Sequence, residues 1–106
     1  MLEELLISEA KHRAHIFKNL DKYLRKIAEI IKEIDKEAQI YLFGSVAEKK
    51  HLLSSDIDIL VVTDKPPGLI LSELWKKGIK DPFEIHVITK TTLKLYARRA
   101  KLVKIK

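Results

Sequence analysis

Two short groups of residues have the types and the spacing that phosphate chemistry needs. The first is the dipeptide Gly44-Ser45, which ends an apolar run, and the second is Ser55-Asp56-Ile57-Asp58, which begins another. A glycine between a strand and a short helix lets a phosphate approach backbone N–H groups closely, and the Ser45 hydroxyl adds a hydrogen-bond donor. Because Gly-Ser is also an ordinary turn dipeptide, the inference depends on the two carboxylates that follow.

Asp56 and Asp58 lie two positions apart at the start of a strand-forming run. Strand alternation puts both on one face, with their Cα atoms about 6.5–7 Å apart. Two carboxylates at this spacing repel each other and form strands poorly. A solvated turn would explain Asp56 but not Asp58, which stands between Ile57 and Ile59. A divalent cation would relieve the repulsion, and ligands that are all oxygen atoms favour Mg²⁺ or Mn²⁺.

A third carboxylate comes from the strand expected at 83–89, where Glu84 and His86 share one face. If this strand pairs with the strand of the two aspartates, Glu84 completes a cluster of three carboxylates. His86 would lie beside the cluster, and we interpret it as a hydrogen-bonded structural histidine because His seldom joins Mg²⁺ sites. His51, in the loop between the two groups, is expected to be exposed to solvent.

The N-terminal third of the chain predicts helix, since residues 2–36 contain no Gly or Pro. Apolar residues recur there at steps of four and three, as in an amphipathic helix: Leu20, Leu24, Ile27, Ile31 and Ile34. We expect one long helix or two, with a break between Asn19 and Asp21. The apolar stripe is expected to pack on the domain's own sheet. The alternative is a contact with another subunit, which would make a homodimer through this segment.

The rest of the chain predicts short strands that alternate with helices. Strands are expected over 39–43, 57–63 and 83–89, and helices just after Gly44, over 69–77 and from Thr91 or Thr92 onward. The last helix has an apolar stripe of Leu93, Tyr96, Ala97, Ala100 and Val103. This order indicates an α/β (α+β) fold, a small sheet flanked by helices.

Composition narrows the class of protein. The 106 residues contain no cysteine, no signal-peptide pattern and no apolar run of the roughly 20 residues that a bilayer span needs, so a cytoplasmic protein is expected. One Asn, one Gln and one Met, with many Lys, Glu and Ile, favour a thermophilic source. The net charge of +6 resides in the last fourteen residues, which hold six Lys or Arg and no acid.

The two groups together resemble the signature of the minimal nucleotidyltransferases, a family within the polymerase-β-like superfamily. Gly44-Ser45-Val46-Ala47 and then Ser55-Asp56-Ile57-Asp58-Ile59 are similar to the pattern Gly-Ser-x-Ala-Arg-Gly, five residues, Ser-Asp-x-Asp and Leu or Ile. The twelve positions from Gly44 to Asp56 match that pattern. The resemblance implies a polymerase-β-like fold, with a small mixed sheet and helices mainly on one face. It implies one domain over 1–106, with a helical segment at 1–36 and a catalytic core at 38–106.

The resemblance also implies roles for individual residues. The metal ligands and catalytic residues would be Asp56, Asp58 and Glu84, and the nucleotide would contact Gly44, Ser45, Ser55 and Lys49. The implied reaction is an attack by an acceptor hydroxyl on the α-phosphate of a nucleoside triphosphate, with ATP the expected donor and Mg²⁺ or Mn²⁺ the cofactor. Two cations can stabilise both the attacking and the leaving oxygen atoms of such a reaction.

The chain departs from the family pattern at two points. Glu48-Lys49 replaces the usual Arg-Gly, and the third acid is Glu84 rather than Asp. Lys49 or Lys50 could take over the basic role near the phosphates, whereas Glu48 would oppose an anionic ligand. Both departures bear on the rate and the nucleotide preference more than on the fold.

Three hypotheses about function follow. The first, which we favour, is a Mg²⁺-dependent nucleotidyltransferase that moves AMP to a hydroxyl of a partner protein. Chains of this type resemble the antitoxins that act on toxins of the HEPN-domain class. The second is a module of weak or no catalytic activity that neutralises a partner by masking it, which Glu48 favours. The third is nucleic-acid binding through the basic C-terminal helix. The alternative explanation of these basic residues is an ordinary solvated helix face, whose charges suit the C-terminal end of the helix dipole.

Overall fold

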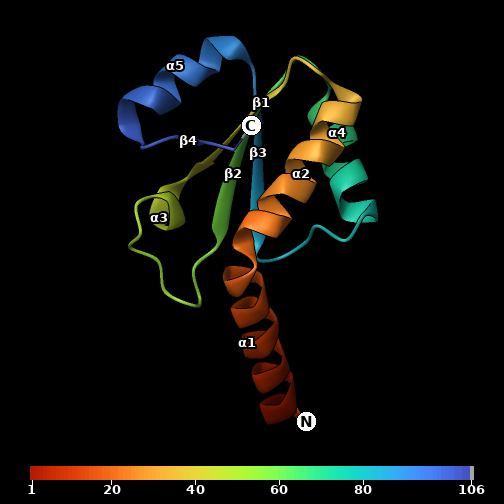
Figure 1. Cartoon of the computed structure of the whole chain (residues 1–106), viewed down its shortest axis with the longest axis vertical. Coiled ribbons are helices and arrows are strands. Elements are labelled where there is room, and N and C mark those ends of the chain that lie inside the picture. The colour runs from red at the N-terminus through yellow and green to blue at the C-terminus, as the bar shows by residue number, and fades with distance from the viewer. Residues whose placement is uncertain (106) are drawn as a thin grey trace.

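The chain folds around a four-stranded mixed sheet, shown in Figure 1 as a computed structural model that describes residues 1–105. The strands are β1 (Gln39–Phe43), β2 (Ile57–Val62), β3 (Phe83–Ile88) and β4 (Val103–Lys104), in the spatial order β3-β2-β1-β4. The helices are α1 (Leu2–Lys18), α2 (Leu20–Ile34), α3 (Gly44–Ala47), α4 (Pro67–Lys76) and α5 (Lys90–Arg99). β1 runs antiparallel to β2 and β4, and β2 runs parallel to β3. The predicted α+β class with a small mixed sheet is confirmed.

One face of the sheet forms the hydrophobic core together with α2 and α4, which lie on the same side in Figure 1. Alternate residues of the paired strands point to this face. The sheet contributes Ile40 and Leu42 of β1 and Ile57, Ile59 and Val61 of β2, and the helices contribute Ile27, Ile31, Ile70 and Leu74. The branched residues of β2 are fully buried, as expected for a central strand.

The opposite face of the sheet carries the polar side chains of Asp58, Glu84 and His86, and α5 lies over part of this face (Figure 1). The Tyr96 ring of α5 meets the Phe43 ring edge to face, with centroids 5.8 Å apart. Leu60, which points to this face, is fully buried. Beyond α5, the face is open along Asp58 and Glu84. The arrangement agrees with the prediction of helices mainly on one face.

The N-terminal segment forms two helices, and the break falls at Asn19 as predicted. The Asn19 side chain donates a hydrogen bond to the His15 carbonyl oxygen, which satisfies a backbone group left free at the end of α1. α2 packs on the sheet, but α1 extends beyond the body of the molecule, and only Ile16 of α1 is buried. The expected packing of the segment on the domain's own sheet therefore holds for α2 alone.

The predicted final helix was too long at its C-terminal end. α5 begins at Lys90, after the N-cap residue Thr89, and ends at Arg99, where Ala100 adopts extended dihedral angles. Val103 was assigned to the helical stripe, but it lies in β4 and pairs with Leu42 at the edge of the sheet. A free sheet edge recruits a strand through backbone hydrogen bonds, which a side-chain pattern does not reveal. The other boundaries differ from the predictions by one or two residues.

Membrane insertion has no support among the described helices, since none within residues 1–105 has both the length and the apolar composition of a bilayer span. The cytoplasmic location stays a prediction.

The junction between α2 and the sheet depends on Asp35, and this gives a test of the fold. The Thr63 hydroxyl donates a hydrogen bond to the Asp35 carboxylate and, as the largest cause, lowers the pKa of Asp35 from its ordinary value of 3.8. We expect Thr63→Val to lower the free energy of unfolding by about 1 kcal/mol at neutral pH. Chemical denaturation measures it, with Thr63→Ser, which keeps the hydroxyl, as the control.

The stability that the Asp35–Thr63 hydrogen bond contributes should decrease at low pH. A carboxylate whose pKa is lower in the folded state stabilises the fold above its unfolded-state pKa, and the contribution is lost as the pH falls through the folded-state pKa. The stability difference between the native chain and Thr63→Val should therefore shrink when the pH falls below about 4. A difference that is equal at pH 7 and pH 3 would contradict this account.

Candidate active site

The two groups of the sequence signature come together because β1 and β2 are antiparallel neighbours. Phe43, the last residue of β1, pairs with Asp58 of β2, and α3 begins at the next residue, Gly44. Gly44 has a positive φ of 76°. A methyl group on its Cα would collide with the Asp58 carboxylate, so the side chain of Asp58 fills the space that glycine leaves. The backbone of Gly44, which the sequence predicts to bind phosphate, therefore lies directly against the Asp58 carboxylate.

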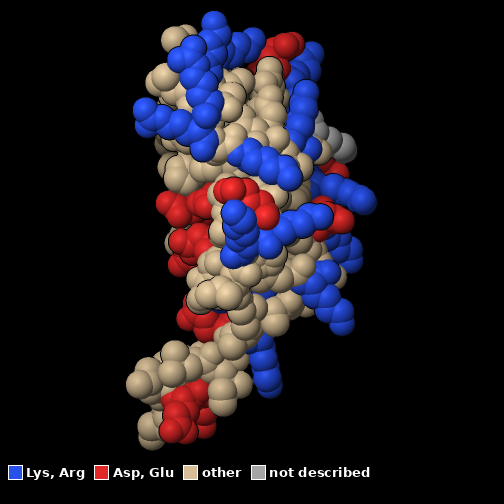
Figure 2. Space-filling view, turned by 90° about the vertical axis from the view of Figure 1, so that its left-hand side faces the viewer, with Lys and Arg blue, Asp and Glu red and all other residues tan. Residues whose placement is uncertain are grey.

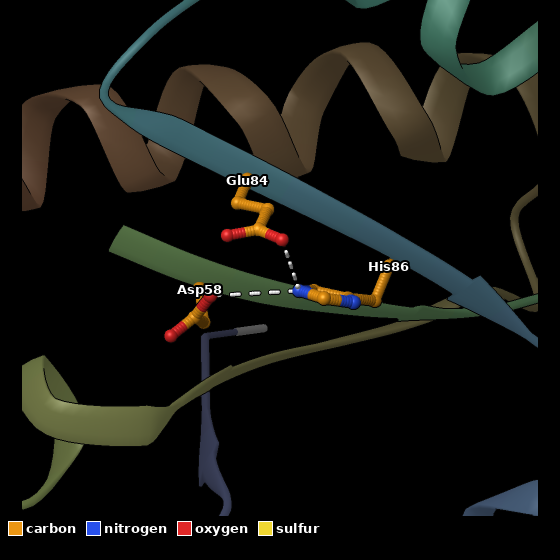
Figure 3. Close-up of side chains that lie close together, drawn as sticks. All are labelled: Asp58, Glu84 and His86. Carbon is orange, nitrogen blue, oxygen red and sulfur yellow. Dashed lines mark ion pairs between the residues drawn. The ribbon is translucent and has the colours of Figure 1, made fainter. Parts of the chain in front are cut away.

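The third acid lies beside Asp58, as predicted from the strand pattern. β2 and β3 are parallel neighbours, and their register pairs Asp58 with Glu84. His86 projects from the same face of β3 as Glu84, so the three side chains converge in Figure 3. Each offers one ligand atom, and these atoms all lie within 4.8 Å of one another. The side chain of Asp58 is 23% exposed and that of Glu84 is 54% exposed, which leaves the cluster accessible from solvent.

His86 lies beside the carboxylates, as expected, but its Nε2 atom lacks the expected hydrogen bond. Its Nε2 atom lies 3.4 Å from Asp58 Oδ1 and 3.6 Å from Glu84 Oε1. This atom is buried and has no hydrogen-bond partner among the described residues, so the interpretation of a hydrogen-bonded structural histidine does not hold for it. A buried polar atom without a partner is costly unless a further group satisfies it.

These three residues fit a divalent cation. Their two carboxylate oxygens and one imidazole nitrogen lie within 4.8 Å of one another, and a cation bound among them would give the buried Nε2 atom a partner. Oxygen ligands suit Mg²⁺ and Mn²⁺, while a nitrogen ligand favours Mn²⁺ over the harder Mg²⁺.

Asp56 does not join this group in the structure. β2 begins at Ile57, so Asp56 precedes the regular ladder, and it is not among the residues whose ligand atoms lie within 4.8 Å of one another. Its Oδ1 atom lies 3.9 Å from the guanidinium of Arg13 on α1. The structure thus brings together Asp58, Glu84 and His86, and it sets Asp56 against α1.

The remaining predicted contacts with the nucleotide lie in and around the loop between α3 and β2. The Ser55 hydroxyl accepts a hydrogen bond from the Leu52 backbone N–H, which shapes the turn before Asp56. Lys49 is exposed and adopts a positive φ of 59° at the end of α3. Glu48 and Lys50 are exposed on either side of it, so the side chains that replace the family's Arg-Gly extend into solvent. His51 is exposed, as expected, and stacks on Phe17.

Charge is distributed unevenly around the site. Figure 2 shows the side of the molecule with α5, where Lys and Arg gather over the end that α5 occupies and acidic residues lie below them. The basic residues of α5 are Lys90, Lys94, Arg98 and Arg99. Because the carboxylate cluster and a basic helix lie on the same side of the sheet, an anionic ligand with a bound cation would meet both charges.

Sequence analysis did not predict the contacts of two residues, for different reasons. The sequence did indicate that His86 lies near the carboxylates, because it shares a strand face with Glu84. We did not count it as a candidate metal ligand because His is rare in Mg²⁺ sites. Arg13 had no such signal, since its hydrogen-bond partner Ser55 lies 42 positions away. Only the packing of α1 brings them together.

Comparison with known proteins decides the family. The model of the family described as "Nucleotidyltransferase domain" matches residues 24–106. The chain belongs to the nucleotidyltransferase domain family. A crystal structure of a protein provisionally named a nucleotidyltransferase is similar at 33% sequence identity and a TM-score of 0.65, covering 79% of this chain and 98% of that one. A second, provisionally named in the same way, from Sulfolobus solfataricus, shows 22% identity and a TM-score of 0.49 over 89% of this chain and 85% of that one.

The match places both halves of the signature inside the nucleotidyltransferase domain. β1, α3 and β2 lie within residues 24–106, as do Glu84 and His86 on β3. α1 and Arg13 lie before the matched residues. The family assignment therefore covers the carboxylate cluster but not the helix that contacts Asp56.

Glycine variants test the contact between Gly44 and Asp58. We expect Gly44→Ala to lower the free energy of unfolding by more than about 1 kcal/mol, because it combines a positive φ with a collision against Asp58. Gly78→Ala has a φ of 86° and no atom within 4 Å of the added Cβ, so it should cost only about 1 kcal/mol of backbone strain. Thermal or chemical denaturation compares the two.

Gly68→Ala is the control for these variants. Gly68 has open space around it and lies in the first turn of α4, so alanine should leave stability unchanged or raise it by a few tenths of a kcal/mol. Equal losses for Gly44→Ala and Gly78→Ala would mean that the Asp58 side chain moves aside freely.

Proposed function

We propose that this protein is a metal-dependent nucleotidyltransferase that moves AMP from ATP to a hydroxyl group of a partner protein. The observation that supports this most directly is the contact between the Gly44 backbone and the Asp58 carboxylate, with Glu84 at its side. This contact supports a site in which the turn that would bind phosphate adjoins the two carboxylates that would bind the metal. Family membership supports the same class of reaction.

The proposed metal site consists of Asp58, Glu84 and His86, with Asp56 adjacent in the chain. Divalent cations bound there would neutralise the phosphates and stabilise the attacking and leaving oxygens. The chain itself supplies the fixed geometry, because Asp58 and Glu84 are anchored to neighbouring strands in register. Such anchoring holds ligands more precisely than loop residues would.

The bond changes balance in a single displacement. The acceptor oxygen forms a bond to the α-phosphorus of ATP, the bond from that phosphorus to the bridging oxygen breaks, and pyrophosphate leaves. The hydroxyl proton passes to a carboxylate, for which the exposed Glu84 is better placed than Asp58. Gly44 and Ser45 bind the β- and γ-phosphates through their N–H groups and the serine hydroxyl, and Lys49 approaches the same phosphates.

The acceptor is proposed to be a protein because the exposed surface suits one. Near its N-terminus α1 carries exposed apolar residues, Leu2, Leu5, Leu6 and Ile7, on a helix that extends beyond the body of the molecule. Leu52 and Leu53 add exposed apolar surface next to the signature loop. Apolar surface of this kind marks protein contacts. By the sequence resemblance, the proposed acceptor is a toxin of the HEPN-domain class and this chain is its antitoxin.

Glu48 favours a second candidate function. An acidic residue stands where the family pattern has arginine, close to the proposed phosphate site, and would repel the triphosphate. A domain of low activity would then neutralise its partner by masking it. Neutralisation in the absence of ATP would support masking, and strict dependence on ATP would count against it. Nucleic-acid binding by α5 is a further alternative. It requires that the affinity of the protein for nucleic acid fall steeply as the salt concentration rises.

Carboxylate variants test the proposed reaction. Transfer from ATP labelled at the α-phosphate to a HEPN-class protein should require Mg²⁺ or Mn²⁺. It should fall by about 100-fold or more in Asp58→Asn, the range for loss of a positioned catalytic group. Asp64→Asn is the matched control, since Asp64 is exposed beyond the end of β2. Calorimetry of ATP binding with and without metal checks the same site without an acceptor. Undiminished transfer by a folded Asp58→Asn protein would contradict the role of Asp58.

The apolar surface of α1 gives an independent test of the acceptor. The double variant Leu5→Glu/Leu6→Glu should weaken binding of the HEPN-class protein by about tenfold or more, because it puts charge into an apolar contact. ATP binding should be unchanged. Leu71→Glu, at an exposed position of α4, is the control for added charge. Sedimentation of the free chain also shows whether this surface pairs with a second copy.

A further inference from the structure

Arg13 of α1 reaches the segment that carries Asp56, although the two lie far apart in the sequence. Its Nη1 atom donates a hydrogen bond of 3.1 Å to the Ser55 carbonyl oxygen, and its Nη2 atom lies 3.9 Å from Asp56 Oδ1. The Arg13 side chain is 18% exposed, while the other residues from Met1 to His15 are exposed to solvent. The fold therefore encloses this arginine in a stretch that otherwise faces solvent.

The sheet does not fix Asp56 by itself. Asp56 precedes the first residue of β2, and its side chain is 56% exposed. The loop before it is held against α1 at a second point, where the ring of His51 stacks on that of Phe17 with centroids 4.9 Å apart and planes 3° from parallel. Phe17 lies one helical turn after Arg13, so both contacts come from the same side of α1.

We propose that Arg13 is a positioning residue of the nucleotidyl-transfer site. It holds the Ser55–Asp56 segment against α1 and so fixes where the Asp56 carboxylate lies relative to Asp58, two residues later in the chain, when a cation binds. A guanidinium suits this role because it is always charged and its planar set of donors fixes the geometry of what it binds. The inference rests on the proposed function, because positioning Asp56 matters only if Asp56 takes part in metal binding.

This role makes α1 part of the site. The family match begins at residue 24, after α1 has ended, so the family pattern assigns nothing to Arg13. A partner that binds the exposed part of α1 would lie on the same helix as the residue that positions Asp56. Groups that orient a metal ligand from outside the coordination sphere typically change metal affinity by 10- to 100-fold.

Calorimetric titration of the full chain with Mn²⁺, without nucleotide, tests the proposal. The variants are Arg13→Lys, which keeps the charge but loses the planar donors, and Arg13→Gln, which loses both. Lys11→Gln is the control, because Lys11 is exposed on the same helix and forms no hydrogen bond or ion pair within residues 1–105. Circular dichroism confirms folding, and Arg13→Lys decides the result if Arg13→Gln does not fold.

We expect both Arg13 variants to bind Mn²⁺ about tenfold more weakly than the native chain, and Lys11→Gln to bind it equally well. Hydrogen exchange at the amides of residues 52–56 should also be faster in both Arg13 variants. Unchanged exchange would overturn the proposal. So would unchanged Mn²⁺ affinity in Arg13→Lys together with tighter binding in Arg13→Gln, because Arg13 would then act only as a competing charge.

The metal titration separates this proposal from the function on which it rests. If the folded native chain binds no Mn²⁺, the proposed metal site fails, and the positioning role fails with it. If the native chain binds Mn²⁺ and the Arg13 variants bind it equally well, only the role of Arg13 is overturned.

Discussion

The close approach of the Gly44 backbone to the Asp58 carboxylate is the contact on which the rest of the site depends. It requires glycine at position 44, both for the positive φ and for the space that the carboxylate occupies. It also requires β1 and β2 to pair in one register, because a slip of one residue would turn Asp58 into the apolar core. The hydrophobic face under α2 and α4 sets that register. Core packing on one face thus determines the chemistry on the other.

The site places like charges together at a cost to stability. Asp58 and Glu84 are direct neighbours on parallel strands, and strand neighbours of like charge destabilise a sheet. His86 lies between their oxygens but leaves its Nε2 atom without a hydrogen bond among the described residues. Local arrangements that lower stability persist where function requires them. A cation would satisfy all three side chains at once, which is why this cluster supports the proposed reaction.

α1 links the site to the exposed surface of the protein. Most of this helix faces solvent, yet Arg13 and Phe17 hold the loop that precedes β2. The helix therefore contributes little to the core while it contacts the segment that carries Asp56. Under the proposed function, a partner bound to the exposed part of α1 would contact the same helix that holds the Ser55–Asp56 segment. Acceptor binding and metal binding would then depend on neighbouring parts of one element.

Much of the fold and part of the candidate site were predictable from local patterns. The apolar periods of α2 and β2, the break at Asn19 and the spacing from Gly44 to Asp58 are properties of short segments, and such local patterns predicted the fold class and most of the elements. The end of α5, β4 and the environments of Asp56 and His86 were decided only by the tertiary structure. These features depend on contacts between residues distant in the chain, such as Arg13 with Ser55, whose free energy arises only after the sheet and α1 have packed.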